Sequence, residues 1–487
     1  MSIGTPDLSA LAPEIAVAVG AMAVLVLDLL LPKQQRRYLV YLSLLTIVVA
    51  GWECAQLWGR SEYHLYNMLA LDDYRLAVDA VILVGTALAI LMSGSYLARE
   101  EMDRGEYYPL MLFAALGMML MAGGLNLVVI FVGLETLSVS LYILCAFARG
   151  RTVSSEAGMK YLLIGSFATA FLLYGIVLVY AATGSTSLVG INQFLSKHSV
   201  VGNHMLFAGI GLLVVGFGFK VAAFPFHIWT PDVYEGAPTP VTAAMAVGVK
   251  AAAFAGFARV FISAFGPVQP LWQPILWWLA VLTMTLGNVV ALAQTNIKRM
   301  LAYSSIAHAG YILIALVTNT PEAMSALIYY LLAYTLMTAG AFGVSILFSG
   351  KGDTGYSIYD YAGLGFRYPW IGAAMTVFMV SLAGFPPTAG FFAKFYLFSA
   401  AVQQGLTSIV VIAVINSVIS VYYYFRVVVL MYMQRRDAEE PRITLKAYGP
   451  VGLAVGLAAA AVLLVGILPA GILELAKSSG MLALSLP

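Results

Sequence analysis

Long apolar runs recur along the whole chain and constrain its fold more than any other feature. Fourteen such runs can be drawn, each separated from the next by glycine, proline or charged breaks. A helix of about 20 residues crosses the hydrocarbon core, and inside lipid a helix satisfies its own backbone polar groups. The sequence therefore predicts an all-α polytopic membrane protein with about 14 transmembrane helices. The predicted spans are 11–31, 38–58, 76–97, 108–123, 126–148, 157–182, 204–229, 240–265, 272–294, 300–318, 322–348, 370–402, 406–433 and 448–474.

The composition agrees with this interpretation. Charged residues make up 10% of the 487 residues and hydrophobic residues 61%, whereas a soluble domain carries about 25% charged residues. The 25 basic and 23 acidic residues leave a formal net charge of +2, which excludes a nucleic-acid-binding protein.

The sequence offers no site for a cofactor or a metal. Its two cysteines, Cys54 and Cys145, are too few for an iron–sulfur cluster or a structural zinc, which take about four ligands. No glycine-rich phosphate loop, metal-ligand spacing or nucleophile–base arrangement is present. We therefore expect this chain to bind no cofactor, and any redox chemistry to belong to another chain.

Basic residues are concentrated in alternate loops. Only Arg60, Arg75, Lys197 and Lys477 fall in even-numbered loops or near the C-terminus. By the positive-inside rule, the odd-numbered loops are predicted to be cytoplasmic and both termini to lie outside. The odd-numbered loops carry Lys33, Arg36, Arg37, Arg99, Arg104, Arg149, Arg151, Lys160, Lys298, Arg299, Lys351, Arg367, Arg435, Arg436, Arg442 and Lys446.

Five basic residues are predicted to lie within spans. A charge at the bilayer centre costs at least about 2.5–3.5 kcal/mol, so it usually faces protein or water and marks an ion path. We interpret Lys220, Lys250 and Lys394 in this way, and a structural ion pair is the alternative. Arg259 and Arg426 lie within about two turns of their span ends, so we expect them to reach the headgroups.

Glu135 is the acidic residue placed deepest in a span. Ser138 and Tyr142 share its face at helical spacing, and we expect a buried lysine as its counter-ion. His308 also lies within a span, where a proton relay and a satisfied core histidine are both open interpretations. Three other acids near span ends are expected at the membrane interface: Asp28, Glu53 and Asp79.

Two predicted spans are interrupted beside a buried lysine. Pro225 follows Lys220, and Pro386 and Pro387 precede Lys394. Proline removes a backbone donor and breaks the helix, which is tolerated where a span lines a cavity. Paired broken spans indicate the transport site of an inverted-repeat protein.

The spacing of the charged residues suggests an internal repeat. The separation in sequence from Glu135 to Lys220 matches that from His308 to Lys394 to within a single position. A repeat of this kind would align Glu135 with His308 and Lys220 with Lys394. We expect a single membrane domain (1–487) with five-helix repeats at 108–265 and 272–433, flanked by helices in 1–97 and 448–487. An odd number of helices inverts the second repeat.

These charges suit proton handling. Burial favours the neutral form of a lysine and a nearby carboxylate favours the charged form. Movement of Glu135 relative to Lys220 is therefore expected to act as a switch, with Lys250 and His308 as relays and Lys394 as the far gate.

Two segments give this pattern a family resemblance. The sequences at 224–241 (FPFHIWTPDVYEGAPTPV) and 294–308 (QTNIKRMLAYSSIAH) resemble the antiporter-like membrane subunits of respiratory complex I, and the similarity extends over essentially the whole chain. The resemblance implies that Glu135, Lys220, Lys250 and Lys394 are proton-channel residues and that His308 belongs to a central hydrophilic axis. It also implies the cell inner membrane, and partner subunits that bind FMN, iron–sulfur clusters, NADH and quinone.

Two other functions remain open. Similar sequences also form subunits of cation/proton antiporters without redox partners. The chain could alternatively be a structural subunit whose buried charges only hold the bundle together.

Overall fold

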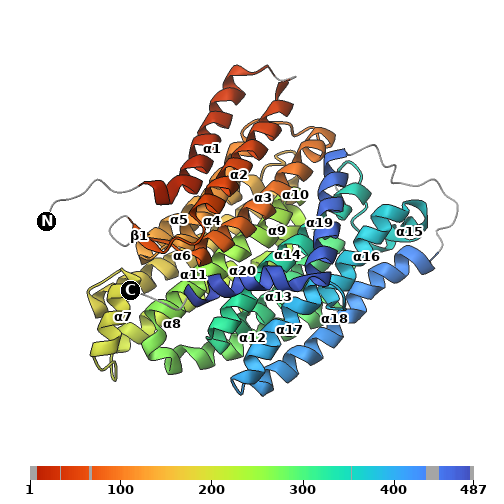
Figure 1. Ribbon diagram of the computed structural model, residues 1–487. Coiled ribbons are helices and arrows are strands. Elements are labelled where there is room, and N and C mark those ends of the chain that lie inside the picture. The colour runs from red at the N-terminus through yellow and green to blue at the C-terminus, as the bar shows by residue number, and fades with distance from the viewer. Residues whose placement is uncertain (1–7, 33–34, 65–67, 353, 435–448, 483–487) are drawn as a thin grey trace.

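The computed structural model describes residues 8–32, 35–64, 68–352, 354–434 and 449–482 and shows an almost entirely helical protein (Figure 1). Twelve helices in these residues are long and apolar enough to cross a membrane, and two shorter apolar helices accompany them. The predicted all-α polytopic class is confirmed, and the count of 14 spans stays a prediction. Five basic residues predicted in loops fall outside the described residues: Lys33, Arg435, Arg436, Arg442 and Lys446.

The helices follow the apolar runs along the chain. The longer ones are α1 (Ala12–Leu30), α2 (Arg37–Leu57), α3 (Asp73–Arg99), α4 (Tyr107–Gly123), α5 (Leu127–Cys145), α6 (Thr152–Thr183), α8 (His204–Val221), α12 (Gln269–Ala291), α13 (Ile297–Thr318), α14 (Pro321–Phe348), α16 (Pro369–Ala383), α17 (Ala389–Gln403), α18 (Thr407–Met433) and α19 (Gly449–Ile467). One further span is continuous from 239 to 264 and contains α10 (Thr239–Ala244), the π-helix η3 (Met245–Val249), α11 (Lys250–Ala258) and the π-helix η4 (Arg259–Ala264).

Short elements connect or flank these helices. They are η1 (Ser9–Leu11), α7 (Leu188–Lys197), α9 (Trp229–Gly236), η5 (Gly266–Val268), η6 (Ile358–Tyr361), α15 (Leu364–Arg367) and α20 (Pro469–Leu482). Strands β1 (Glu62–His64) and β2 (Leu69–Leu71) form an antiparallel pair.

The centre of the bundle is formed by the 239–264 span together with α13 and α14. The most apolar window of the first is completely buried, and those of the other two are 94% buried, whereas only 33% is buried in α1, α2 and α6. Helix α20 lies across the other helices rather than along them and packs against α14 and α3 (Figure 1). The deepest part of the molecule is therefore built from the helices that carry Lys250 and His308.

Glycines allow two helix pairs to approach closely. A Cβ atom at Gly117 of α4 would lie 2.5 Å from the backbone nitrogen of Leu137 in α5. In the same way, a Cβ atom at Gly287 of α12 would lie 2.6 Å from the backbone nitrogen of Ala307 in α13. Small residues at membrane helix contacts allow backbone approach of this kind, so a larger side chain at either position would separate the pair.

Two matching backbone bridges fix the starts of α5 and α13. Asn126 pairs with Ser187, and Asn296 pairs with Ser357. Each asparagine is also the N-cap of its helix and accepts a backbone N–H bond with its side chain. The two asparagines are as far apart in the sequence as the two serines, so the second bridge repeats the first without a shift. Helices α7 and α15, which lie beyond these serines, are at opposite ends of the bundle (Figure 1).

Both predicted interruptions are helix ends in the structure. Helix α8 stops at Val221, where Ala222 takes a left-handed conformation with φ +61°, instead of continuing to 229. Helix α16 stops at Ala383, where Gly384 has φ +89°, and α17 begins at Ala389. The proline-containing segments therefore separate paired helices, as their missing backbone donors predict.

Candidate functional site

Lys220 lies in the last turn of α8 and is held by neutral groups. Its side chain is buried, and Nζ donates to Ser138 Oγ at 2.7 Å. Ser138 in turn donates to the backbone carbonyl of Leu134, one turn back along α5. The ammonium also lies 5.3 Å from the Tyr161 ring centre and 5.9 Å from that of Tyr142. Hydroxyl and aromatic groups stabilise the cation here without supplying a full negative charge.

Glu135 is not the hydrogen-bonding partner of Lys220. Among the described residues no ion pair joins the two, and the lysine contacts Ser138 instead, so a counter-ion role for Glu135 stays a prediction. Glu135 is half-buried, accepts a hydrogen bond from Thr169 Oγ1 at 2.9 Å, and lines a cavity of about 650 Å³ between α5 and α6. Ser138, one helical turn away from Glu135, is fully buried and is the α5 side chain that contacts the lysine.

Lys250 begins α11, directly after the π-helix η3. The side chain is buried, and Nζ donates to the backbone carbonyl of Ser305 in α13. The ring of Tyr334 lies 6.0 Å from Nζ, and its hydroxyl is close to those of Ser305 and Thr338. A π-helical turn widens a helix locally and often occurs at functional sites. In this span it directly precedes the buried lysine.

His308 bridges two tyrosines at the centre of the bundle. Nδ1 and the Tyr330 hydroxyl are 2.7 Å apart, and Nε2 and the Tyr424 hydroxyl are 3.2 Å apart. The Tyr424 hydroxyl is also hydrogen-bonded to Ser304. Both ring nitrogens therefore have partners, as a core histidine requires. The same contacts form a chain of exchangeable protons, because neutral imidazole donates from one nitrogen and accepts at the other.

Lys394 is positioned by the break between α16 and α17. Its Nζ donates to the carbonyls of Leu382 at 3.2 Å and Ala383 at 3.0 Å, and to Ser417 Oγ at 2.8 Å. The ring centre of Tyr311 is 5.1 Å away. The last carbonyls of a helix have no partner within the helix and form its negative end. The interruption of α16 thus creates the acceptors that hold this buried cation.

The ring of Tyr311 lies beside both Lys394 and His308, and its hydroxyl belongs to a network of amide and hydroxyl groups. The Tyr311 ring contacts both residues and lies edge-on to the imidazole, 5.7 Å between ring centres. Its hydroxyl accepts from Asn288 Nδ2 at 2.9 Å, and Asn288 Oδ1 accepts from Tyr423 at 2.9 Å. Sequence reasoning did not identify five residues of this network: Asn288, Tyr330, Ser417, Tyr423 and Tyr424. Polar side chains on otherwise apolar helices were the available signal.

A pocket of about 230 Å³ between α6 and α9, called the charged cup here, is lined by Glu156, Lys160, Asp232 and Glu235. Asp232 accepts from Lys160 Nζ at 2.9 Å and from Arg299 Nη1 at 2.8 Å, and Arg299 also contacts Glu235 at 2.9 Å. Partial burial raises the pKa of Asp232, but the hydrogen bonds and charges of its two basic partners outweigh burial, so this pKa is lowered overall. Lys160 of the cup immediately precedes Tyr161, whose ring contacts Lys220, in the same turn of α6.

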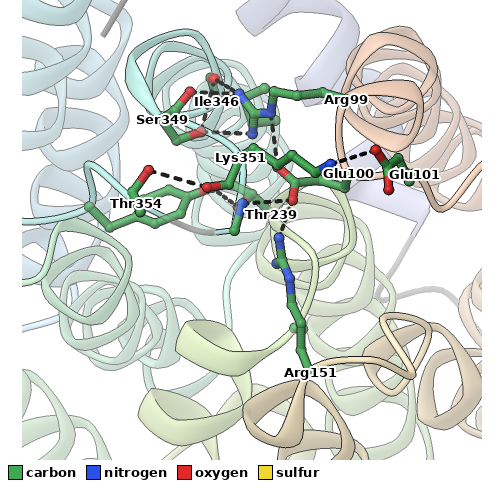
Figure 2. Close-up of polar contacts among 12 residues, drawn as sticks. Arg99, Glu100, Glu101, Arg151, Thr239, Ile346, Ser349, Lys351 and Thr354 are labelled. Carbon is green, nitrogen blue, oxygen red and sulfur yellow. Dashed lines mark hydrogen bonds and ion pairs between the residues drawn. The ribbon is translucent and has the colours of Figure 1, made fainter. Parts of the chain in front are cut away.

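Three loops are tied together at Glu100, which follows α3 (Figure 2). Its buried carboxylate accepts from Arg99 Nε at 2.9 Å, from Arg151, and from the backbone nitrogen of Gly352 at 3.0 Å. Arg99 also donates to the Ser349 carbonyl at 2.7 Å. These contacts join the segments next to α3, α6 and α14, so Glu100 holds three parts of the chain together.

Two expectations about charges near span ends are wrong. Arg259 is buried rather than extended to the headgroups, and both of its terminal nitrogens bind Asp72, at 2.8 and 2.9 Å. Asp79 is fully buried rather than interfacial and contacts Arg75, which lies inside α3 rather than in a loop. Bidentate and paired contacts remove the need to reach water. Arg426 does extend outward, to the Tyr359 hydroxyl at 2.9 Å.

Comparison with known proteins agrees with this architecture. Residues 124–420 match a family model described as the membrane part of NADH:quinone oxidoreductase and Mrp antiporters. A relative from Trichlorobacter lovleyi, named NADH-quinone oxidoreductase subunit N, is 47% identical and covers 98% of this chain and 97% of its own length. The subunit N of Chloroflexus aggregans is 41% identical, covering 98% of each chain.

Solved structures show the same fold. A chain of respiratory complex I from Thermus thermophilus has a TM-score of 0.81 and 36% identity, covering 96% of this chain and 99% of that one. A chain of the Mrp complex from Dietzia has a TM-score of 0.86 at 19% identity, covering 98% of each. The second likeness shows the fold alone. On this sequence similarity, the chain belongs to the NADH:quinone oxidoreductase and Mrp antiporter family of membrane subunits.

Proposed function

We propose that this chain is a proton-translocating membrane subunit of an NADH:quinone oxidoreductase. In this function, electron transfer from NADH to quinone in partner subunits drives proton movement through the chain. The observation that carries the proposal is the set of three buried lysines, Lys220, Lys250 and Lys394, whose ammonium groups contact neutral oxygens instead of carboxylates. A structural ion pair would supply a charged partner, whereas neutral acceptors leave the lysine able to gain and lose a proton.

The proposed path runs from the charged cup to the break between α16 and α17. Protons reach Lys220 past the wall formed by Tyr161, pass through Lys250 and the tyrosine-bridged His308, and reach Lys394. Glu135 acts on Lys220 through its charge, while Ser138, on the next turn of the same helix, makes the hydrogen bond. The central helices exclude lipid from this path because they are buried on nearly all sides.

We further infer that the chain contains two inverted five-helix repeats. The paired bridges support an alignment of Asn126 with Asn296, and the close helix contacts at Gly117 and Gly287 fit the same alignment. This alignment places Ser138, the partner of Lys220, at the position of His308, where the spacing of the charged residues had placed Glu135. Ser138, which contacts Lys220, and His308, which bridges two tyrosines, are then equivalent positions of the two repeats that carry different polar groups.

The redox groups of such an enzyme are assigned to other chains. The two cysteines of this chain, Cys54 and Cys145, lie on α2 and α5, and the described residues contain no group of three or more His, Cys, Asp or Glu that could hold a metal. FMN, iron–sulfur clusters, NADH and quinone are therefore proposed to bind partner subunits. The excess of basic residues in odd-numbered loops supports cytoplasmic loops, outer termini and an inner-membrane location.

A subunit of a cation/proton antiporter without redox partners is the alternative. The full-length relatives named as oxidoreductase subunits favour the first function, since the family model covers both classes and the solved Mrp structure is only 19% identical. Affinity purification of the tagged chain from mild detergent separates the two. NADH dehydrogenase activity that copurifies in fixed proportion supports the oxidoreductase, and its absence from an intact multisubunit complex supports the antiporter.

The proton path is tested by Lys220→Ala, with the exposed Lys197→Ala as a matched control. Assembly is measured by native electrophoresis and proton pumping by dye quenching in inverted vesicles driven by NADH. We expect assembled complex with impaired pumping for Lys220→Ala and normal pumping for Lys197→Ala. Intact assembly with undiminished pumping in Lys220→Ala would overturn the path.

A further inference from the structure

A second buried ionic cluster lies away from the proposed proton path, where α1, α3 and η4 meet. It contains three carboxylic acids and two arginines, and all five side chains are buried. The members are Glu14, Asp72, Arg75, Asp79 and Arg259. Main-chain groups close the cluster, since Arg75 donates to the Ala70 carbonyl at 2.8 Å and Arg259 donates to the Ala122 carbonyl at 3.0 Å.

The three acids are bound unequally. Asp72 accepts from both terminal nitrogens of Arg259 and from the backbone nitrogen of Arg75 at 2.8 Å. Both oxygens of Glu14 contact Arg75 Nη2. Asp79 has a single contact, 3.3 Å from its Oδ2 to Arg75 Nε, and its buried Oδ1 has no partner among the described residues.

The charges of the cluster do not balance if every acid is ionised. Arginine stays protonated in proteins, so the two guanidinium groups offset only two of the three carboxylates. An uncompensated carboxylate in a low-dielectric interior is very unfavourable, and such groups take up a proton instead. Because Asp79 has the fewest and longest contacts, it is the acid whose neutral form costs the fewest interactions.

We propose that Asp79 holds a proton, which makes this cluster a proton-binding site separate from the path through Lys220 and Lys394. The proton sits on the buried Oδ1, while Oδ2 keeps its contact with Arg75. Release of the proton would change the charge between α1 and α3 by one unit. The site is independent of the proposed function, because it depends only on charges within the first three helices and η4.

The groups that face Asp79 do not supply the missing positive charge. Glu14 approaches from α1, Arg75 from its own helix and Arg259 from η4, and both arginines are already paired with other acids. From α2, the buried thiol of Cys54 faces the same region, and Glu53 is its neighbour in the chain. Every additional group is therefore neutral or acidic, which favours the protonated form of Asp79.

The site is tested by comparing Asp79→Asn with Glu14→Gln in the full chain, purified in lipid nanodiscs. Asparagine has the shape and charge of a protonated aspartic acid, so Asp79→Asn is expected to leave Tm unchanged at neutral pH. Glu14→Gln removes the ionised partner of Arg75 and is expected to lower Tm by on the order of 5 °C. Equal destabilisation by the two substitutions would overturn the proposal.

Infrared spectroscopy provides a second readout that does not depend on the behaviour of Glu14→Gln. A protonated carboxyl group has a carbonyl stretching band that a carboxylate lacks. We expect this band in wild type at neutral pH, its loss in Asp79→Asn, and its retention in Glu322→Gln, a control at an exposed acid. A spectrum of Asp79→Asn identical to that of wild type would show that Asp79 is ionised and would reject the site.

Discussion

Replacement of Ser138 by alanine removes the hydrogen bond that holds the ammonium of Lys220. In this bond, Lys220 Nζ donates to Ser138 Oγ at 2.7 Å. A hydrogen bond to a charged group contributes about 1.5–3 kcal/mol, and about 1.36 kcal/mol corresponds to a tenfold change. The protonated lysine would keep the aromatic faces of Tyr142, Tyr161 and Phe219. We therefore expect Ser138→Ala to slow proton translocation roughly tenfold or more.

The assay measures NADH-driven proton pumping and NADH oxidation in inverted vesicles with equal amounts of assembled complex. Ser140→Ala is the matched control, because Ser140 lies on the same helix and donates only to the Thr136 carbonyl one turn back, at 2.9 Å. We expect the control to pump like wild type. Equal pumping by Ser138→Ala and Ser140→Ala would refute the role of this hydrogen bond.

The remaining predictions concern the other polar groups. Glu135→Gln is expected to impair pumping in assembled complex, and pumping equal to wild type across the pH range would contradict the action of Glu135 on Lys220. Ser417→Ala is expected to slow pumping less than Ser138→Ala, because Lys394 keeps two backbone carbonyls; the same vesicle assay ranks the two variants. Arg259→Gln breaks a buried bidentate ion pair and is expected to cost about 3–5 kcal/mol. It should reduce assembled complex on native gels, whereas Arg426→Gln, at a partly exposed position, should not. The lowered pKa of Asp232 makes its contact stabilising above the unfolded value of about 3.9 and progressively lost as pH falls through the folded value. Thermal unfolding of wild type should therefore be more acid-sensitive below about pH 4 than that of Asp232→Asn.

The sequence was sufficient to predict the membrane class, the burial of the three lysines and the two helix breaks. These properties are local. An apolar run satisfies its own backbone bonds as a helix, so its span follows from its length. A proline interrupts those bonds wherever it lies within such a run. The position of Lys220 inside an apolar run therefore followed without knowledge of any other helix.

The partners of the charges were decided by tertiary structure. The sequence placed Glu135 opposite a lysine, but the packing of α5 against α8 presents Ser138 to Lys220 instead. It placed Arg259 at a headgroup, yet Asp72, far away in the chain, provides a buried carboxylate. Helix formation depends on residues three and four apart, whereas the facing side chain depends on the rotation and approach of distant helices.

The proposed repeat shows the same division between local and tertiary information. Charge spacing aligned Glu135 with His308, because the interval from Glu135 to Lys220 nearly equals the interval from His308 to Lys394. The backbone bridges at Asn126 and Asn296 favour an alignment of Ser138 with His308 instead. The sequence by itself determined the helical membrane class and the positions of the three buried lysines in apolar runs. Only the tertiary structure decided which oxygen each buried cation binds, because that choice depends on how separate helices pack.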